Sequence, residues 1–138
     1  MNYEKSCGAV VFTIQNHKIM YVIVQSKEGH YGFPKGHMEY EETEIETALR
    51  EVFEETGLIP TIIDGFKRYD EYVLPTKKGV LKQVVYFLVK YDKQEIIVQE
   101  EELSDVILMQ YEDAINVLEF DSLKGILKAA DEFIKNTH

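Results

Sequence analysis

Residues Gly36–Leu58 read GHMEYEETEIETALREVFEETGL, and this stretch decides the fold of the chain. Its middle is a helix by pattern, because apolar residues recur at i, i+3, i+4, i+7 and i+8 and form one stripe along a helix. Thr43 is the expected N-cap with Glu46 as its capping-box partner, and Gly57 is the expected end of the helix. The stripe, which we expect to pack on the core, comprises Ile45, Ala48, Leu49, Val52 and Phe53.

Three glutamates lie together on that helix, on the side that we expect to face away from the stripe. Glu51, Glu54 and Glu55 are spaced i, i+3 and i+4, so their side chains are neighbours. Their repulsion destabilises a helix by roughly 0.2–0.5 kcal/mol per pair, and a divalent cation would remove it. Carboxylate oxygens are the ligands that magnesium prefers, together with substrate phosphates. The alternative is a solvated acidic face, which the glycines and the arginine at fixed offsets disfavour.

Every constrained position of the Nudix box is filled here, so the chain resembles the Nudix hydrolases. That family cleaves diphosphate bonds in nucleotide-like substrates, and its fold is an α/β/α sandwich with a mixed sheet. The resemblance implies a magnesium site, with manganese as the alternative ion, in which Glu51 is a ligand or a base. It implies that Arg50 orients the carboxylates and that Glu42 is a more distant ligand or a partner of Arg50. The metal ligands so implied are Gly36, Glu42, Glu51, Glu54 and Glu55.

Outside the box, strands and helices follow one another without regular alternation, which indicates an α/β fold with a mixed sheet between helical layers. Ser6–Ile14 and Ile19–Gln25 predict a hairpin. Leu81–Tyr91 is apolar on both faces, which is typical of a central strand covered on both sides. Further strands are expected at Pro60–Tyr72, with a bend at Gly65, and at Glu95–Val98. Loops are expected at Lys27–Pro34, Pro75–Gly79 and Glu100–Asp105. Helices are expected at Asp113–Leu118 and Ser122–Ile134.

Composition limits the class of protein. The 138 residues, 45% of them hydrophobic and 29% charged, fit one domain spanning 1–138. The net charge of −10 argues against non-specific nucleic-acid binding and against an anionic membrane surface. Without a signal peptide or a bilayer-length apolar run, we expect a cytoplasmic protein. Cys7, the single cysteine, lies in an apolar run and is expected to be a buried thiol.

Segments outside the box narrow the resemblance to the asymmetrical diadenosine tetraphosphate hydrolases. They are Ser6–Ala9, Phe33–His37, Gly65–Arg68 with Glu71–Val73, and Lys82–Leu88. Such a substrate carries phosphates, which bind Lys and Arg, and two adenines, which stack on aromatic rings for roughly 1–3 kcal/mol per base. Core packing is the alternative for each ring. The expected substrate-binding residues are Lys35, His37, Tyr72, Lys82, Tyr86 and Phe120.

The general base varies across this family and often comes from a loop outside the box. Glu102 is the best match in register, with Glu101 next, and a solvated acidic loop is the alternative. Those relatives tend to carry histidines in this loop, whereas Glu100–Ser104 has none. The missing histidines leave open which group protonates the leaving group and which substrate the enzyme selects.

The leading interpretation is a magnesium-dependent hydrolase that converts diadenosine tetraphosphate to ATP and AMP. The alternative enzyme acts on (deoxy)nucleoside triphosphates, including oxidised ones, or on RNA 5′ ends. A non-catalytic nucleotide-sensing module is disfavoured, because such a module is expected to lose box carboxylates and this chain keeps them all. A nucleotide is the expected partner, with neither a membrane nor a stable nucleic-acid partner.

Overall fold

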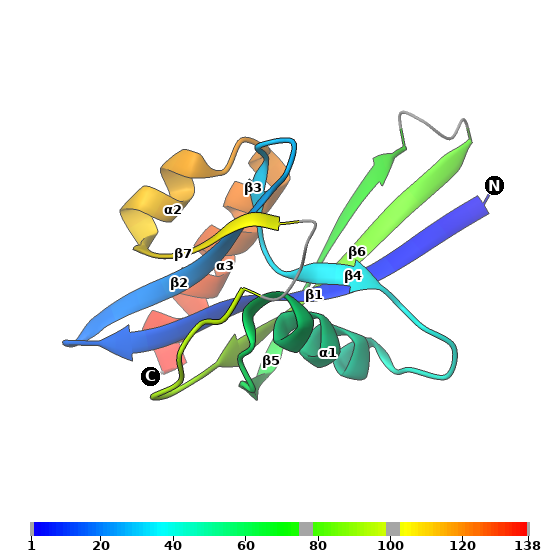
Figure 1. The fold of residues 1–138 in the computed structure, drawn as a ribbon. Helices are drawn as coiled ribbons and strands as arrows, with labels where there is room; N and C mark the ends of the chain where they lie inside the picture. The colour runs from blue at the N-terminus through cyan, green and yellow to red at the C-terminus, as the bar shows by residue number, and fades with distance from the viewer. Residues whose placement is uncertain (1, 75–78, 99–102, 138) are drawn as a thin grey trace.

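A mixed sheet runs through the molecule, with α1 on one face and α2 and α3 on the other (Figure 1). The computed structural model describes residues 2–74, 79–98 and 103–137, and within these ranges the sheet has seven strands. The predicted α/β/α sandwich with a mixed sheet is therefore confirmed. The strands are β1 (Asn2–Gln15), β2 (Lys18–Ser26), β3 (Tyr31–Gly32), β4 (Lys35–His37), β5 (Thr61–Val73), β6 (Val80–Lys90) and β7 (Leu103–Gln110), and the helices are α1 (Glu44–Thr56), α2 (Tyr111–Val117) and α3 (Asp121–Thr137).

The sheet has the order β3-β2-β1-β6-β5, with β4 paired to β1 and β7 paired to β2. Strands β1 and β6 run parallel and the other pairs are antiparallel. The predicted β1–β2 hairpin is confirmed, and its turn residues Asn16 and His17 have φ angles of 51° and 66°. Positive φ at both central residues suits the right-handed twist of the flanking strands.

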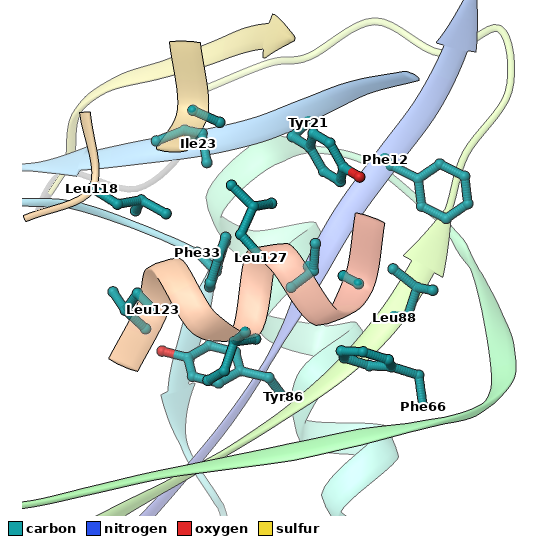
Figure 2. Packing of buried hydrophobic residues seen from close by; sticks show 14 of the residues in the cluster. Phe12, Tyr21, Ile23, Phe33, Phe66, Tyr86, Leu88, Leu118, Leu123 and Leu127 are labelled. Atoms are coloured by element: carbon teal, nitrogen blue, oxygen red, sulfur yellow. The ribbon is translucent and has the colours of Figure 1, made fainter. Parts of the chain in front are cut away.

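Strand β6 is buried on both faces, as its sequence predicts. Val84, Tyr86 and Leu88 enter the core under α3, and Val85 and Val89 enter the cores under α1. Each large side chain buried in this way contributes roughly 1.5–3 kcal/mol. Figure 2 shows the core under α3, where Leu123 and Leu127 lie among Phe33, Tyr86 and Ile23.

Helix α1 has the predicted ends but not the predicted face. Thr43 and Glu46 form the capping box, and Gly57 ends the helix at φ 76°. The apolar stripe is only partly right, because Ile45 and Phe53 are 41% and 44% exposed. The helix buries Ala48 and Val52 as predicted, and it is rotated so that it also buries Thr47, Glu55 and Thr56.

The C-terminal half departs most from the sequence predictions. Glu95–Val98 is not a strand, and Leu103–Gln110, of which the first three residues were expected in a loop, is strand β7 against β2. The loop expected at Lys27–Pro34 contains the short strand β3. The predicted helices are confirmed with shifted ends. None of the described helices is long and apolar enough to cross a membrane.

Candidate active site

Strand β4 places Gly36 directly against the box helix. Its pairing with β1, in which Gly36 lies opposite Cys7, fixes the backbone there. A Cβ atom on Gly36 would collide with the carboxyl group of Glu51, so a larger residue there would require the Glu51 side chain to move. The neighbouring Lys35 N–H donates to Glu55 Oε2 over 3.1 Å. The backbone of β4 therefore lies against two carboxylates of the box, Glu55 through a hydrogen bond and Glu51 through close contact.

The carboxyl groups of Glu55 and Glu51 lie together, with Glu55 buried and Glu51 partly buried. Glu55 is 5% exposed, so it lies on the buried side of α1 and not on the solvent side that the sequence predicts. Burial, followed by the charge of Glu51, raises the pKa of Glu55 to about 8. Burial also raises the pKa of Glu51. Both groups hold protons more tightly than an ordinary glutamate, chiefly because burial disfavours the charged carboxylate, and for Glu55 also because the charge of Glu51 is near.

Arg50 connects the remaining carboxylates. Its Nε lies 2.6 Å from Glu42 Oε2, and its Nη1 lies 2.9 Å from Glu51 Oε2 and 3.2 Å from Glu54 Oε2. Its Nη2 donates to the His37 carbonyl over 2.9 Å. The guanidinium lowers the pKa of Glu42 to about 2. The structure thus brings Glu42 against Arg50 and sets Arg50 among the carboxylates that it was expected to orient.

The donor set fits a hard divalent cation. In residues 2–74, 79–98 and 103–137, no three His, Cys, Asp or Glu side chains already converge as a metal cage. Burial raises the pKa of both Glu51 and Glu55, and the neighbouring charges of Glu54 and Glu51 respectively add to this, so a cation placed there would stabilise the ionised carboxylates. Glu54, with its side chain 43% exposed, adds a third carboxylate at the same surface. Oxygen donors of this kind suit magnesium or manganese.

A cleft of about 1230 Å³ opens over these carboxylates. It extends from the box helix to β5 on one side and to the β2–β3 turn and the start of α3 on the other. It brings together ten of the predicted site residues. They are Gly36, Arg50, Glu51, Glu54 and Glu55 from the box, and Lys35, His37, Tyr72, Tyr86 and Phe120 from the expected substrate set.

The aromatic residues in the cleft differ in how far they can reach a ligand. Tyr72 and Phe120 are 40% and 51% exposed and offer open ring surface. Tyr86 is 1% exposed and its ring packs edge-on against Phe33 at 5.4 Å between centroids. The ring of Tyr86 is therefore core, as the alternative interpretation has it.

Of the predicted residues that the structure describes, two do not lie on the wall of the cleft. Glu42 is held by Arg50, and Lys82 is 5% exposed with its Nζ 3.1 Å from His37 Nε2. Glu102, the expected base, lies with Glu101 outside the described residues. Leu103, the next residue along the chain, lines the cleft.

Sequence reasoning missed several residues of the cleft. His30 comes from the β2–β3 turn, where its ring lies 5.9 Å from that of Phe120. Asp70 and Glu71 precede Tyr72 on β5 and line the same wall. These residues could have been suspected because they lie close in sequence to the predicted site residues in Phe33–His37 and at Tyr72. The pattern alone did not say which of them turn towards the cleft.

Comparison with known proteins gives close relatives over almost the whole chain. The asymmetrical bis(5′-nucleosyl)-tetraphosphatase of Mus musculus is 30% identical over 145 residues, covering 96% of this chain and 97% of the relative. An Ap4A hydrolase of C. elegans, solved as a binary complex, has a TM-score of 0.88 at 25% identity and covers 96% of this chain and 98% of its own. The NUDIX domain of Shewanella oneidensis NrtR, complexed with ADP ribose, has a TM-score of 0.75 at 21% identity, covers 96% of this chain and 90% of its own, and shows likeness of fold alone.

A family model described as NUDIX domain matches residues 3–132. This match spans the box, the strands that carry the cleft and most of α3. The chain belongs to the Nudix family and is a Nudix hydrolase.

Proposed function

We propose that this enzyme hydrolyses diadenosine tetraphosphate to ATP and AMP with magnesium as its cofactor. The observation that carries the proposal is the shape of the cleft, which joins the box carboxylates to open rings at Tyr72 and Phe120. A dinucleoside polyphosphate needs that combination of a metal site and aromatic surfaces. The relatives named as asymmetrical tetraphosphatases support the same substrate.

In this proposal, Glu51, Glu54, Glu55 and the Gly36 carbonyl hold the cation. When bound, magnesium supplies charge neutralisation and Lewis-acid activation for attack of water on phosphorus. The protein supplies the arrangement of the ligands. Arg50 holds the carboxylates of Glu51 and Glu54, of which Glu51 lies against Gly36, and the Lys35 backbone N–H holds Glu55.

The substrate itself would lie along the cleft. Tyr72 and Phe120 stack on its bases, and Lys35 and His37, on the wall next to the box, bind its phosphates. Glu102 is the proposed general base. Its support is that the following residue, Leu103, lines the cleft, so the chain enters β7 beside the site. A cytoplasmic location remains part of the proposal.

A nucleotide panel with magnesium tests the proposal. Diadenosine tetraphosphate, ATP, dGTP, oxidised dGTP and capped RNA are each incubated with the enzyme, and products are separated. Release of equal ATP and AMP from diadenosine tetraphosphate, at the highest kcat/KM of the panel, is expected. Faster turnover of a triphosphate or of capped RNA would contradict the proposed substrate and support the alternative substrate class.

Glu54→Gln separates an enzyme from a nucleotide-sensing module. Loss of a metal ligand should lower the rate by orders of magnitude while the fold survives, because Glu54 is partly exposed. Glu132→Gln, an exposed glutamate on α3, is the matched control. An unchanged rate in Glu54→Gln would contradict the metal assignment.

A further inference from the structure

Strand β5 is the last strand on one side of the sheet, and its second half is open to solvent (Figure 1). In the part of the chain that the structure describes, β5 pairs with β6 and no strand pairs with its other edge. Residues 67–73 are all exposed except Asp70, which is partly buried. Helix α3 reaches β5 further back, where Phe133 packs on Phe66. The backbone edge of residues 67–73 is therefore accessible to another strand.

Alternate residues of this stretch direct their backbone groups away from β6. The pairing with β6 is regular up to the end of β5, and the following residue, Leu74, donates its N–H to β6 over 3.0 Å. Every second residue before Leu74 faces β6 in the same way, so the N–H and C=O groups of Lys67, Tyr69 and Glu71 face the open edge. The Lys67 carbonyl accepts a hydrogen bond from Arg68 Nη1 over 3.0 Å, and its second lone pair can accept another.

The charges of this stretch are arranged in two halves of opposite sign. It reads Lys67-Arg68-Tyr69-Asp70-Glu71. Around a two-fold axis at Tyr69, a second antiparallel copy places Lys67 opposite Glu71. It also places Arg68 opposite Asp70. Opposite charges directly across two antiparallel strands attract each other, and the residues whose backbone groups face the edge would exchange both of their hydrogen bonds with the copy.

Other antiparallel registers of the same stretch lack this match. When the centre moves by one or two residues, it falls on Lys67, Arg68, Asp70 or Glu71. Each of these residues then lies opposite itself, and like charges directly opposite are destabilising. Two copies with a net charge of −10 also repel each other overall, so a local match of charge is needed to bring them together. The pairing centred on Tyr69 provides that match.

Two of the four charged residues also have partners within their own chain. Lys67 Nζ lies 2.9 Å from Glu44 Oε1, and Glu71 Oε1 accepts from Gln83 Nε2 over 2.9 Å. These contacts compete with contacts to a second copy. Arg68 and the acidic residue opposite it should therefore carry most of the attraction between the copies.

We propose that two copies of this chain associate edge to edge through residues 67–71 of β5, about a two-fold axis at Tyr69, so that their two sheets become one. This inference goes beyond the proposed function and does not depend on the substrate. Because Asp70 lines the cleft, the pairing would bring Arg68 of the second copy to the cleft wall of the first. A short strand edge is a small interface, so the expected dimer is weak, with a dissociation constant on the order of 10–100 µM.

Analytical ultracentrifugation of the full chain from about 1 to about 500 µM measures the association. A reversible equilibrium between monomer and dimer is expected. Arg68→Asp and Asp70→Arg each set like charges across the two strands, so each should raise the dissociation constant roughly tenfold or more. Lys128→Asp, the same change of charge at an exposed position of α3, is the control and should dimerise like the wild type. A wild type that stays monomeric at every concentration overturns the proposal.

A mixture of the two variants tests the register. One chain is then acidic at both positions and the other is basic at both, so the equimolar mixture of R68D and D70R should dimerise although neither variant does so alone. The double variant R68D/D70R, in which the charges are exchanged within one chain, should also dimerise. If neither the mixture nor the double variant recovers the dimer, the pairing centred on Tyr69 is wrong.

Tyr69→Pro tests the backbone pairing without a change of charge. It removes the N–H at the centre of the pairing, and proline is tolerated in an edge strand where the N–H faces solvent. Y69P should keep the circular dichroism spectrum of the wild type and lose the dimer. Hydrogen exchange of the wild type gives a second measurement, in which the amides of Tyr69 and Glu71 should exchange more slowly at high than at low protein concentration. A dimer of unchanged strength in folded Y69P, or exchange that is independent of concentration, overturns the pairing.

Discussion

Arg50 holds Glu42 with two nitrogen atoms, Nε at 2.6 Å from Oε2 and Nη2 at 3.0 Å from Oε1. Two parallel bonds of this kind require the planar guanidinium fork. The third nitrogen, Nη1, contacts Glu51 and Glu54. One side chain therefore fixes the loop before α1 to the carboxylates on α1.

Arg50→Lys keeps the charge and removes the fork. A single ammonium group cannot hold Glu42 in two bonds and still contact Glu51 and Glu54. We expect hydrolysis and metal affinity to fall roughly 10- to 100-fold, as is usual when a residue that orients metal ligands is changed. Steady-state kinetics and a magnesium titration measure both. Arg68→Lys, on the exposed part of β5, is the control, and equal losses in the two variants would contradict the role of Arg50.

The sequence predicts the box well because its signals are local. The capping box of Thr43 and Glu46 and the stop at Gly57 depend on neighbours within one or two turns, and both are confirmed. The buried face of α1 was predicted only in part, because tertiary contacts also bury Glu55. The Lys35 N–H, which arrives on β4, hydrogen-bonds Glu55, and the helix is turned so that this glutamate is buried.

Strand β7 was missed for a similar reason. Leu103–Gln110 begins in an acidic run that was expected to be a loop, and the short apolar run Val106–Met109 that follows does not distinguish a strand from a helix. Its pairing with β2 makes it a strand. The cleft shows the same limit, since Asp70 and Glu71 line it through the position of β5, and the resemblance of Glu71–Val73 to the family did not say which of its side chains face the cleft.

Gly36→Ala tests the close approach of β4 to the box helix. The added Cβ would meet the Glu51 carboxyl group, so the backbone or Glu51 must shift. We expect a loss of activity of at least about tenfold, because the Glu51 carboxyl group is displaced, and a loss of stability at the low end of the roughly 1–3 kcal/mol that overpacking costs, because the atoms that must move are the end of a flexible side chain. Chemical denaturation and a hydrolysis assay measure the two effects.

Gly125→Ala is the matched control for that substitution. Gly125 lies within α3, and a Cβ there would meet nothing within 4 Å. Alanine in a helix interior is favoured over glycine by roughly 0.5–1 kcal/mol, so this variant should be slightly more stable. If Gly125→Ala and Gly36→Ala destabilise the protein equally, the collision at Glu51 is not the cause.

Cys7 should be an unreactive thiol in the native protein. It is fully buried, as the sequence predicts, and burial raises its pKa from 9.0 to about 11. At pH 8 the thiolate fraction is then about 100-fold lower than for an ordinary thiol, and the thiolate is the reactive form. Labelling with a chromogenic disulfide reagent should be slow in buffer and fast in urea. Fast labelling of the folded protein would contradict this burial.

Glu55 should make the metal-free protein less stable as the pH rises. Its pKa is about 8 in the folded state against 4.5 for the ordinary group. Below about pH 4.5 both states bind the proton and Glu55 costs nothing. Between the two values the unfolded chain releases the proton while the folded chain keeps it, so the free energy of unfolding falls, by an amount on the order of a few kcal/mol. Above about pH 8 the loss is complete.

Urea unfolding in EDTA at pH values from about 5 to about 9 measures this slope, and the difference between wild type and Glu55→Gln isolates it from other titrating groups. Glutamine keeps the shape of the protonated carboxyl group and cannot ionise, so the variant should become the more stable protein towards pH 9 while losing hydrolysis. Glu132→Gln should follow the wild type throughout. Added magnesium should restore stability to the wild type at high pH and not to Glu55→Gln, because the cation takes the place of the proton between Glu55 and Glu51. Parallel curves for wild type and Glu55→Gln would mean that Glu55 is ionised in the folded protein without metal.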